Sequence, residues 1–287
     1  MCYLYPVINT KMNSLIGIKG FFSVIRDGII TTDSERRYVM HPILLSISGF
    51  EIKTAYVLWL LSSVVFMLWT RRRGEVRYSQ NPAALSYAVL ASYLAAVAGA
   101  LVFGALESGQ SFLSQAAWRG DLSSSGGILL GTAAGLAAAK KQNISFGRFF
   151  DAAAVPAAVS IGIWRLGCLA EGCCRGVRAA EHTCLTLSYP GEAFARNAYT
   201  AEEALYVFLC SAVLAAAERY FLSERECGRG AVAGLGLIMY SVFRLLIDPL
   251  REEGLGPWGY AAFIILALTG TVLVIRAYKK RDGHPAK

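Results

Sequence analysis

The sequence predicts an all-α, polytopic membrane protein with about seven transmembrane helices. Three observations support this class. Hydrophobic residues make up 55% of the 287 residues and charged residues only 17%, against about 25% in an ordinary soluble domain. Seven apolar runs are each close to the roughly 20 residues that cross a bilayer as a helix. Lysines and arginines are concentrated in alternate segments between these runs, which is typical of membrane proteins.

The first four predicted helices differ in how apolar they are. The first, Ile52–Trp69, has one charge at its edge, Lys53, and the second, Ala83–Leu106, has none. The third, Leu122–Ala139, is uncharged but rich in Ser, Gly and Ala. The fourth, Ala152–Ala170, has an arginine near its end. All four are long enough to be spanning helices.

The last three predicted helices are less uniform. Ala204–Ala217 is short, and reaches spanning length only by extending back over "TAEE". Ala231–Leu250 contains an arginine and an aspartate, whereas Pro257–Ile275 is uncharged. We interpret residues 40–287 as one domain. Residues 1–39 are an N-terminal extension with no recognisable pattern.

The net charge of +8 is explained by topology rather than by a nucleic-acid partner. Fifteen lysines and arginines lie in segments 71–77, 140–148, 219–229 and 276–287, and five lie in the opposite loops. The side with the basic excess is the cytoplasmic side. With seven spans, the N-terminus is predicted outside and the C-terminus inside.

Three charges lie within predicted spans, near the same predicted end. They are Arg165, Arg244 and Asp248, and each costs roughly 2.5–3.5 kcal/mol at a helix centre. Tyr240 and Arg244 share a helix face with Asp248 because they are spaced by four, and Pro249 disfavours helix at Asp248. One interpretation is an internal Arg244–Asp248 ion pair. The other is a basic pocket for an anionic headgroup, since arginine suits phosphate.

Four cysteines, Cys168, Cys173, Cys174 and Cys184, lie at the end of the fourth span and beyond it. That side is oxidising in most bacteria, so a structural disulfide is one interpretation. Small packing residues, and redox or metal chemistry, are the alternatives. The stretch lacks the C-x-x-C spacing of many zinc sites. We predict no metal and no cofactor.

Four stretches carry a family resemblance. "GIWRLGCLAEGCCRG" resembles the G-R-[IL]-G-N-F-x-N-G-E-x-x-G signature of bacterial prolipoprotein diacylglyceryl transferases, and is closer to a branch with G-R-x-G-C-F-x-x-G-C-C-Y-G. "HPILLSISGFEIKTAYVLWLL", "SSGGILLG" and "GAVAGLGLIMYSVFRLLIDPLREE" resemble three further family segments, in the same order. The resemblance covers roughly residues 40–280.

The resemblance implies a function and a location. The family transfers a diacylglyceryl group from phosphatidylglycerol to a cysteine thiol in the lipobox of a pre-lipoprotein, which forms a thioether. The expected protein is therefore a multi-pass enzyme of lipoprotein biosynthesis in the bacterial cytoplasmic (inner) membrane, with its site facing the extracytoplasmic side. No other cofactor and no nucleic acid are implied.

The resemblance also implies site residues. The expected catalytic residues are Arg165, Arg244, Asp248, Tyr240, Ser125 and Glu171. The expected substrate-binding residues are Gly126, Gly127, Gly167, Gly172, Gly176, Arg251 and Arg196. Ser125 stands where the family has a histidine, so the general base is open among Glu171, Asp248 and His182. Asp248 stands where the family has glutamate. "RNAYTAEE" keeps only Arg196 and Glu203 of another family segment.

Two other functions remain as alternatives. The lost histidine and the altered "RNAYTAEE" are consistent with a non-catalytic relative that binds a lipid or a partner on the same scaffold. The clustered cysteines are consistent with a membrane thiol oxidoreductase. Formation of a diacylglyceryl thioether by purified protein would separate the transferase from both.

Overall fold

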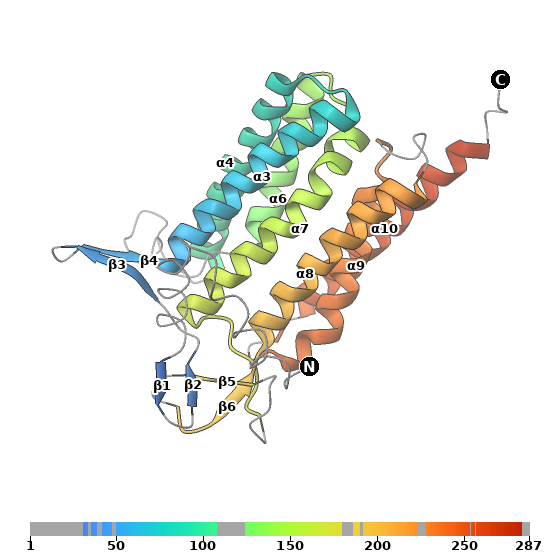
Figure 1. Ribbon diagram of the computed structural model, residues 1–287. Coiled ribbons are helices and arrows are strands. Elements are labelled where there is room, and N and C mark those ends of the chain that lie inside the picture. The colour runs from blue at the N-terminus through green and yellow to red at the C-terminus, as the bar shows by residue number, and fades with distance from the viewer. Residues whose placement is uncertain are drawn as a thin grey trace, which may run out of the picture. The chain divides into compact units, whose positions relative to one another are not determined.

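The all-α class is confirmed by the computed structural model, which describes residues 31–33, 36–38, 42–47, 50–107, 124–179, 186–189, 192–222, 228–252, 254–255 and 257–282. These residues form seven α-helices (Figure 1): α3 (Thr54–Tyr78), α4 (Pro82–Glu107), α6 (Ser124–Lys141), α7 (Phe146–Glu171), α8 (Tyr199–Ala216), α9 (Ala231–Ile247) and α10 (Pro257–Asp282). All except α6 are long and apolar enough to cross a membrane. The many Ser, Gly and Ala residues of α6 lower its hydropathy.

Six short strands lie outside the helices and were not predicted. They are β1 (Thr31–Asp33), β2 (Arg36–Tyr38), β3 (Ile43–Ile47), β4 (Phe50–Lys53), β5 (Thr186–Ser188) and β6 (Ala195–Asn197). β3 and β4 form an antiparallel hairpin directly before α3. The other four form a sheet in the order β1-β2-β5-β6, in which only β2 and β5 are parallel.

The start of α8 and the end of α9 agree with the sequence, whereas the end of α3 lies later than predicted. α8 begins at Tyr199, so "TAEE" belongs to the helix. α9 ends at Ile247 and a 3₁₀ turn, Asp248–Leu250, follows, as expected for the residue before a proline. The arginines of segment 71–77 were predicted in a loop, but they lie on α3. Arginine is a good helix former and its long side chain reaches polar surroundings from a helix end.

The chain divides into two compact units. The first contains residues 1–61, 161–206 and 243–260, and the second contains residues 62–160, 207–242 and 261–287. The first unit therefore holds the strands, the end of α7, the start of α8 and the end of α9. It contains the anomalous charges of α7 and α9, together with Cys168, Cys173 and Cys174.

In the second unit, α4 and α6 lie side by side (Figure 1), and glycines stand where the two helices approach. A Cβ on Gly126 would overlap the carbonyl oxygen of Gly99 and lie 2.6 Å from Cγ of Phe103. A Cβ on the adjacent Gly127 would lie no closer than 3.2 Å to its nearest neighbour, the carbonyl oxygen of Ala96. Small residues thus allow the two backbones to approach, which gains dispersion contacts within the membrane.

We expect Gly126→Ala to lower the free energy of unfolding by about 1–3 kcal/mol, because the added methyl group has no space and the helices must separate. Gly127→Ala is the matched control. Its methyl group fits with little movement, and alanine favours the helix over glycine by about 1 kcal/mol. Thermal unfolding of both variants in the same detergent measures the difference. Equal stability of the two variants would contradict this account of the packing.

A proline inside α7 is accommodated by an arginine of the second unit. Pro156 has no N–H, so the carbonyl of Ala152 loses its helical partner. Nε of Arg73 donates to this carbonyl oxygen at 3.3 Å, and its Nη2 lies 2.6 Å from Glu218 Oε2. Arg77 donates to Oε1 of the same glutamate at 3.0 Å. Two of the basic residues that indicated topology are therefore also structural.

The start of α9, within the second unit, is fixed by a buried carboxylate. Oδ2 of Asp151 accepts hydrogen bonds from the backbone N–H groups of Gly228 and Gly230 at 2.8 and 2.9 Å. Oδ1 accepts from Ala233 N–H at 2.9 Å. The N–H groups of Gly230 and Ala233 are among those that a helix start leaves without intrahelical partners, and Gly228 lies in the turn before the helix. Asp151 thus holds the beginning of the helix that carries Arg244 further along.

Candidate functional site

One buried glutamate brings together the two intramembrane arginines. Nε of Arg165, on α7, lies 3.0 Å from Oε2 of Glu203, on α8. Nη1 of Arg244, on α9, donates to the same oxygen at 3.4 Å. The exposed fraction is 0% for the Glu203 side chain, 17% for Arg165 and 3% for Arg244. Two cations facing one anion leave the group with a net positive charge.

Desolvation explains why these charges must be grouped. Moving an unpaired ion from water into a protein costs several kcal/mol of desolvation free energy. One buried carboxylate between two guanidinium groups offsets part of this cost for each of the two arginines. The Arg244 guanidinium also lies 5.8 Å from the ring centroid of the buried Tyr199, within range of a cation–π contact. The side chains of Arg165 and Arg244 are thus held by contacts from α8.

Asp248 does not form the ion pair that its spacing from Arg244 suggested. The N–H of Leu255 lies 3.0 Å from each of its carboxylate oxygens, and the Tyr260 hydroxyl donates to Oδ2 at 2.5 Å. The 3₁₀ turn at Pro249 redirects the chain, so that the carboxylate accepts from the following loop and from the start of α10. Arg244 contacts the carboxylate of Glu203 instead.

The segment after α9 is paired with the segment after α7. Gly176 and Arg251 form an antiparallel β-bridge. On either side, Val177 N–H donates to the Leu250 carbonyl at 2.9 Å and Glu252 N–H donates to the Arg175 carbonyl at 3.0 Å. A Cβ on Gly176 would overlap the carbonyl oxygen of Asn197. The role of Gly176 is therefore close backbone packing.

Arg196, predicted to bind substrate, is a structural link in the same region. Its Nε lies 2.6 Å from Glu192 Oε2, and its Nη1 lies 2.7 Å from Glu252 Oε1 and donates to the Gly176 carbonyl at 3.1 Å. The hydrogen bonds from Arg196, with the charges of Arg196 and Arg175, hold the pKa of Glu192 below its usual value. These donors therefore contact the protein itself, and substrate binding by Arg196 stays a prediction.

Arg251 differs from Arg196 in this respect. Its Nε is buried, and no hydrogen-bond partner for it lies among the residues that the structure describes. The hydroxyl of Tyr199 is likewise buried without a partner in this part of the chain. Buried donors without protein partners are rare, so both groups are available to bind a ligand.

The glycines of "GIWRLGCLAEGCCRG" have conformational and packing roles. A Cβ on Gly167 would lie 2.7 Å from Nε1 of Trp59, which stacks on Trp164. Gly172 adopts φ 73° directly after α7, a conformation that favours glycine. Both residues shape the end of α7, and their role in substrate binding stays a prediction.

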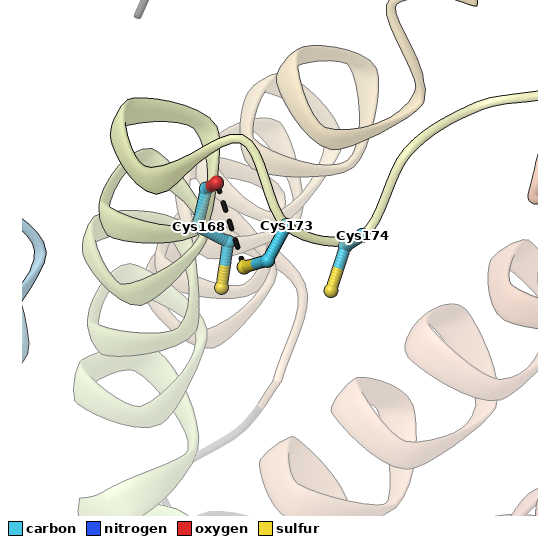
Figure 2. Close-up of side chains that lie close together, drawn as sticks. All are labelled: Cys168, Cys173 and Cys174. Atoms are coloured by element: carbon cyan, nitrogen blue, oxygen red, sulfur yellow. Dashed lines mark hydrogen bonds between the residues drawn. The ribbon is translucent and has the colours of Figure 1, made fainter. Parts of the chain in front are cut away.

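Three cysteines meet where α7 ends. The sulfur atoms of Cys168, Cys173 and Cys174 all lie within 4.8 Å of one another, and Figure 2 shows their side chains directed to the same side of the backbone. All three are free thiols. Arg165 Nη1 lies 3.6 Å from Cys174 Sγ. Hydrogen bonds from the other two thiols, together with the charges of Arg165 and Arg251, lower the pKa of Cys174.

The other predicted residues fall into three groups. Glu171 forms an ion pair with Lys53, at 2.7 Å between Nζ and Oε1. Tyr240, Gly126 and Gly127 belong to the second unit, where the Tyr240 ring makes an edge-to-face contact with Phe263. The side chain of Ser125, and the whole of His182 and Cys184, lie outside the described residues.

Two site residues, Glu203 and Tyr199, were missing from the predicted set. Their signal was present in "RNAYTAEE", where Glu203 was noted as a retained family position. A glutamate near a helix start usually faces water, so its burial could not be inferred from the segment alone. Tyr199 carried no signal beyond its place in that segment.

Comparison with known families shows the family of the chain. Residues 42–278 match the model of the family described as prolipoprotein diacylglyceryl transferase. No curated protein matches the chain. The matched range includes Arg165, Glu203, Arg244 and the three clustered cysteines. Together with the six apolar helices, the match describes a multi-pass transferase-type protein of the bacterial inner membrane, and the chain belongs to the prolipoprotein diacylglyceryl transferase family.

Proposed function

We propose that the protein transfers the diacylglyceryl group of phosphatidylglycerol to a cysteine thiol of a pre-lipoprotein. The observation that carries the proposal is the meeting of Arg165 and Arg244 on one oxygen of Glu203. Two guanidinium groups and one carboxylate leave an excess positive charge, which suits a lipid phosphate. Arginine donates parallel hydrogen bonds to phosphate oxygens.

The reaction requires stabilisation of negative charge. The thiolate of the acceptor attacks the glycerol carbon that bears the phosphate ester, and the carbon–oxygen bond breaks. The electron pair leaves with the oxygen, so the singly charged phosphodiester becomes glycerol phosphate with a second negative charge. Preorganised cations in a site shielded from water lower such a barrier. Arg165 and Arg244 act there as catalytic residues, and the unpartnered Arg251 Nε adds a donor.

The remaining predicted residues are assigned more modest roles in this proposal. Asp248 fixes the loop that carries Arg251, since it accepts hydrogen bonds from Leu255 and Tyr260. Glu171 is less suited to act as the base because the ion pair of its Oε1 with Lys53 favours the charged carboxylate over the protonated one. Tyr240, Ser125 and the paired glycines Gly126 and Gly127 stay candidate contacts for the lipid.

The site is proposed to face the extracytoplasmic side. The basic residues at 140–141, on α6, and at 276–281, on α10, are at the ends of helices that the positive-inside rule places in the cytoplasm. α7 follows α6 and α9 precedes α10, so the last residues of α7 and α9 belong to the side opposite to these basic helix ends. Arg165 is six residues before the end of α7, and Arg244 is three residues before the end of α9.

The test is transfer by purified protein in vesicles of phosphatidylglycerol, with a lipobox peptide that contains cysteine. The expected result is a peptide heavier by one diacylglyceryl group, with one glycerol phosphate released for each peptide modified. Phosphatidylcholine vesicles and a peptide with serine in place of cysteine are the controls. A peptide mass unchanged in phosphatidylglycerol vesicles would overturn the proposal.

A non-catalytic lipid-binding relative is the second candidate. The observation that favours it concerns the described candidates for the missing base: Oε1 of Glu171 is paired with Lys53, and both carboxylate oxygens of Asp248 accept hydrogen bonds. It predicts saturable binding of phosphatidylglycerol without a modified peptide. Detection of the thioether in the transfer assay would exclude it.

A further inference from the structure

The three-cysteine cluster has a geometry that the proposed reaction does not by itself require. Cys168 lies on the last turn of α7, and Cys173 and Cys174 follow on the turn after it. All three sulfur atoms lie within 4.8 Å of one another and on one side of the backbone (Figure 2). Gly172 and Cys174 both adopt positive φ, 73° and 55°. For Cys174 this conformation is uncommon and costs energy.

The cluster has the ligands and spacing of a zinc site with one open position. Thiolate sulfur binds zinc at about 2.3 Å, so a tetrahedral site places its sulfur atoms about 3.8 Å apart. The three sulfur atoms reach that separation by moving less than about 1 Å each. Three protein ligands leave the fourth position for a water or a substrate, as in catalytic zinc sites.

Charges beside the cluster match a metal with three thiolates. Zinc with three thiolates has a net charge of −1, and Arg165 Nη1 lies 3.6 Å from Cys174 Sγ. A hydrogen bond from a neighbouring group to a metal ligand orients that ligand and adjusts the metal's affinity. Arg165 also contacts Glu203, so one side chain links the cysteine cluster to the proposed phosphate site.

We infer that Cys168, Cys173 and Cys174 bind a zinc ion whose open position takes the acceptor cysteine thiol. This inference depends on the proposed function and supplies what it lacks, a means of deprotonating the thiol. A thiol that coordinates zinc is deprotonated outright, so the family's histidine, replaced here by Ser125, is not needed for that step.

The balanced reaction involves no change in oxidation state. The acceptor thiol releases its proton to water as its sulfur binds zinc. That sulfur then attacks the glycerol carbon of the lipid, the carbon–oxygen bond to phosphate breaks, and glycerol phosphate leaves with the electron pair. The neutral thioether is a poorer ligand than a thiolate and dissociates, and Zn²⁺ remains on the three cysteines.

Metal content is the first test. Full-length protein, purified in detergent under reducing conditions and incubated with zinc, is expected to retain about one ion per chain. Each of Cys168→Ser, Cys173→Ser and Cys174→Ser is expected to lose it, whereas Cys210→Ser, which changes a buried cysteine on α8, keeps it. The inference would be overturned if the wild-type protein retained no zinc, or if all three of the variants Cys168→Ser, Cys173→Ser and Cys174→Ser retained it.

Cobalt substitution tests the open position. Co²⁺ in the cluster is expected to give a thiolate-to-cobalt charge-transfer band, which the lipobox peptide with cysteine intensifies and the serine peptide does not. Identical spectra with both peptides would reject the role of zinc in thiol binding. Cys174→His covers the case in which Cys174→Ser misfolds. Histidine is also a zinc ligand and tolerates positive φ better than most residues. This variant is therefore expected to bind the metal, with a weaker thiolate-to-cobalt band.

Transfer assays separate this inference from the proposed function. Thioether formation that continues unchanged after a chelator has removed the metal would leave the proposed function intact and overturn the zinc inference. Protein that binds zinc and the cysteine peptide, but modifies no peptide, would support the zinc site and overturn the transferase.

Discussion

Arg165→Ala is expected to lower the rate of diacylglyceryl transfer by about 10²–10³-fold, the usual effect of removing one preorganised donor to a developing negative charge. The loss arises in the chemical step, because the leaving phosphate gains charge that Arg165 no longer balances. Arg165→Lys keeps the charge but not the planar pair of donors, and so is expected to retain an intermediate rate. The rate of peptide modification at saturating phosphatidylglycerol measures both effects.

Arg175→Ala is the matched control for Arg165. Arg175 is nearby in sequence, but it is exposed and forms an ion pair with Glu192, so its loss is expected to change the rate less than about threefold, since exposed ion pairs contribute under about 1 kcal/mol. If Arg165→Ala and Arg175→Ala transferred at the same rate, Arg165 would have no role in catalysis.

Glu203→Ala is expected to lower the free energy of unfolding by about 3–5 kcal/mol. The carboxylate has no exposed surface and faces both Arg165 and Arg244. Its removal leaves two buried cations close together without an anion between them. Thermal unfolding in mild detergent, followed by circular dichroism, measures the loss.

Glu202→Ala controls for the loss of an acid on the same helix. Glu202 is the preceding residue on α8 and is only half-buried, so we expect a change within about 0.5 kcal/mol. Equal stability of Glu202→Ala and Glu203→Ala would contradict the placement of Glu203 between the arginines. Adding Arg165→Met to Glu203→Ala should recover part of the loss, because one of the unbalanced cations is removed.

The helices could be predicted because lipid imposes a strong constraint on sequence. A spanning segment must satisfy its own backbone hydrogen bonds and expose apolar side chains, so each helix is visible as an apolar run. Leu60, Leu246 and Leu268 are all more than 60% exposed on their helices, as expected where lipid replaces water. The three-residue strands β5 and β6 have no such pattern and could not be predicted.

The site was predictable only in part, because a charged residue stands out in the sequence only where it interrupts an apolar run. Arg165 and Arg244 could be singled out because a charge within an apolar run is costly. Glu203 could not, because an acid near a helix start is ordinary and its burial depends on three helices together. Asp248 was an obvious partner for Arg244 by spacing, but the turn at Pro249 directs it to Leu255 instead.

The pairing of residues 250–252 with residues 175–177 affects how tightly a ligand can be held. Arg251 lies in the middle of this pairing, and the carboxylate of Asp248 fixes the chain on either side of it. When a ligand orders a flexible segment, each long side chain that becomes immobile costs about 0.5–1.5 kcal/mol of binding free energy. Folding has already restricted the backbone of Arg251. Binding of a phosphate to its guanidinium therefore costs the protein less conformational entropy than binding at a mobile loop would.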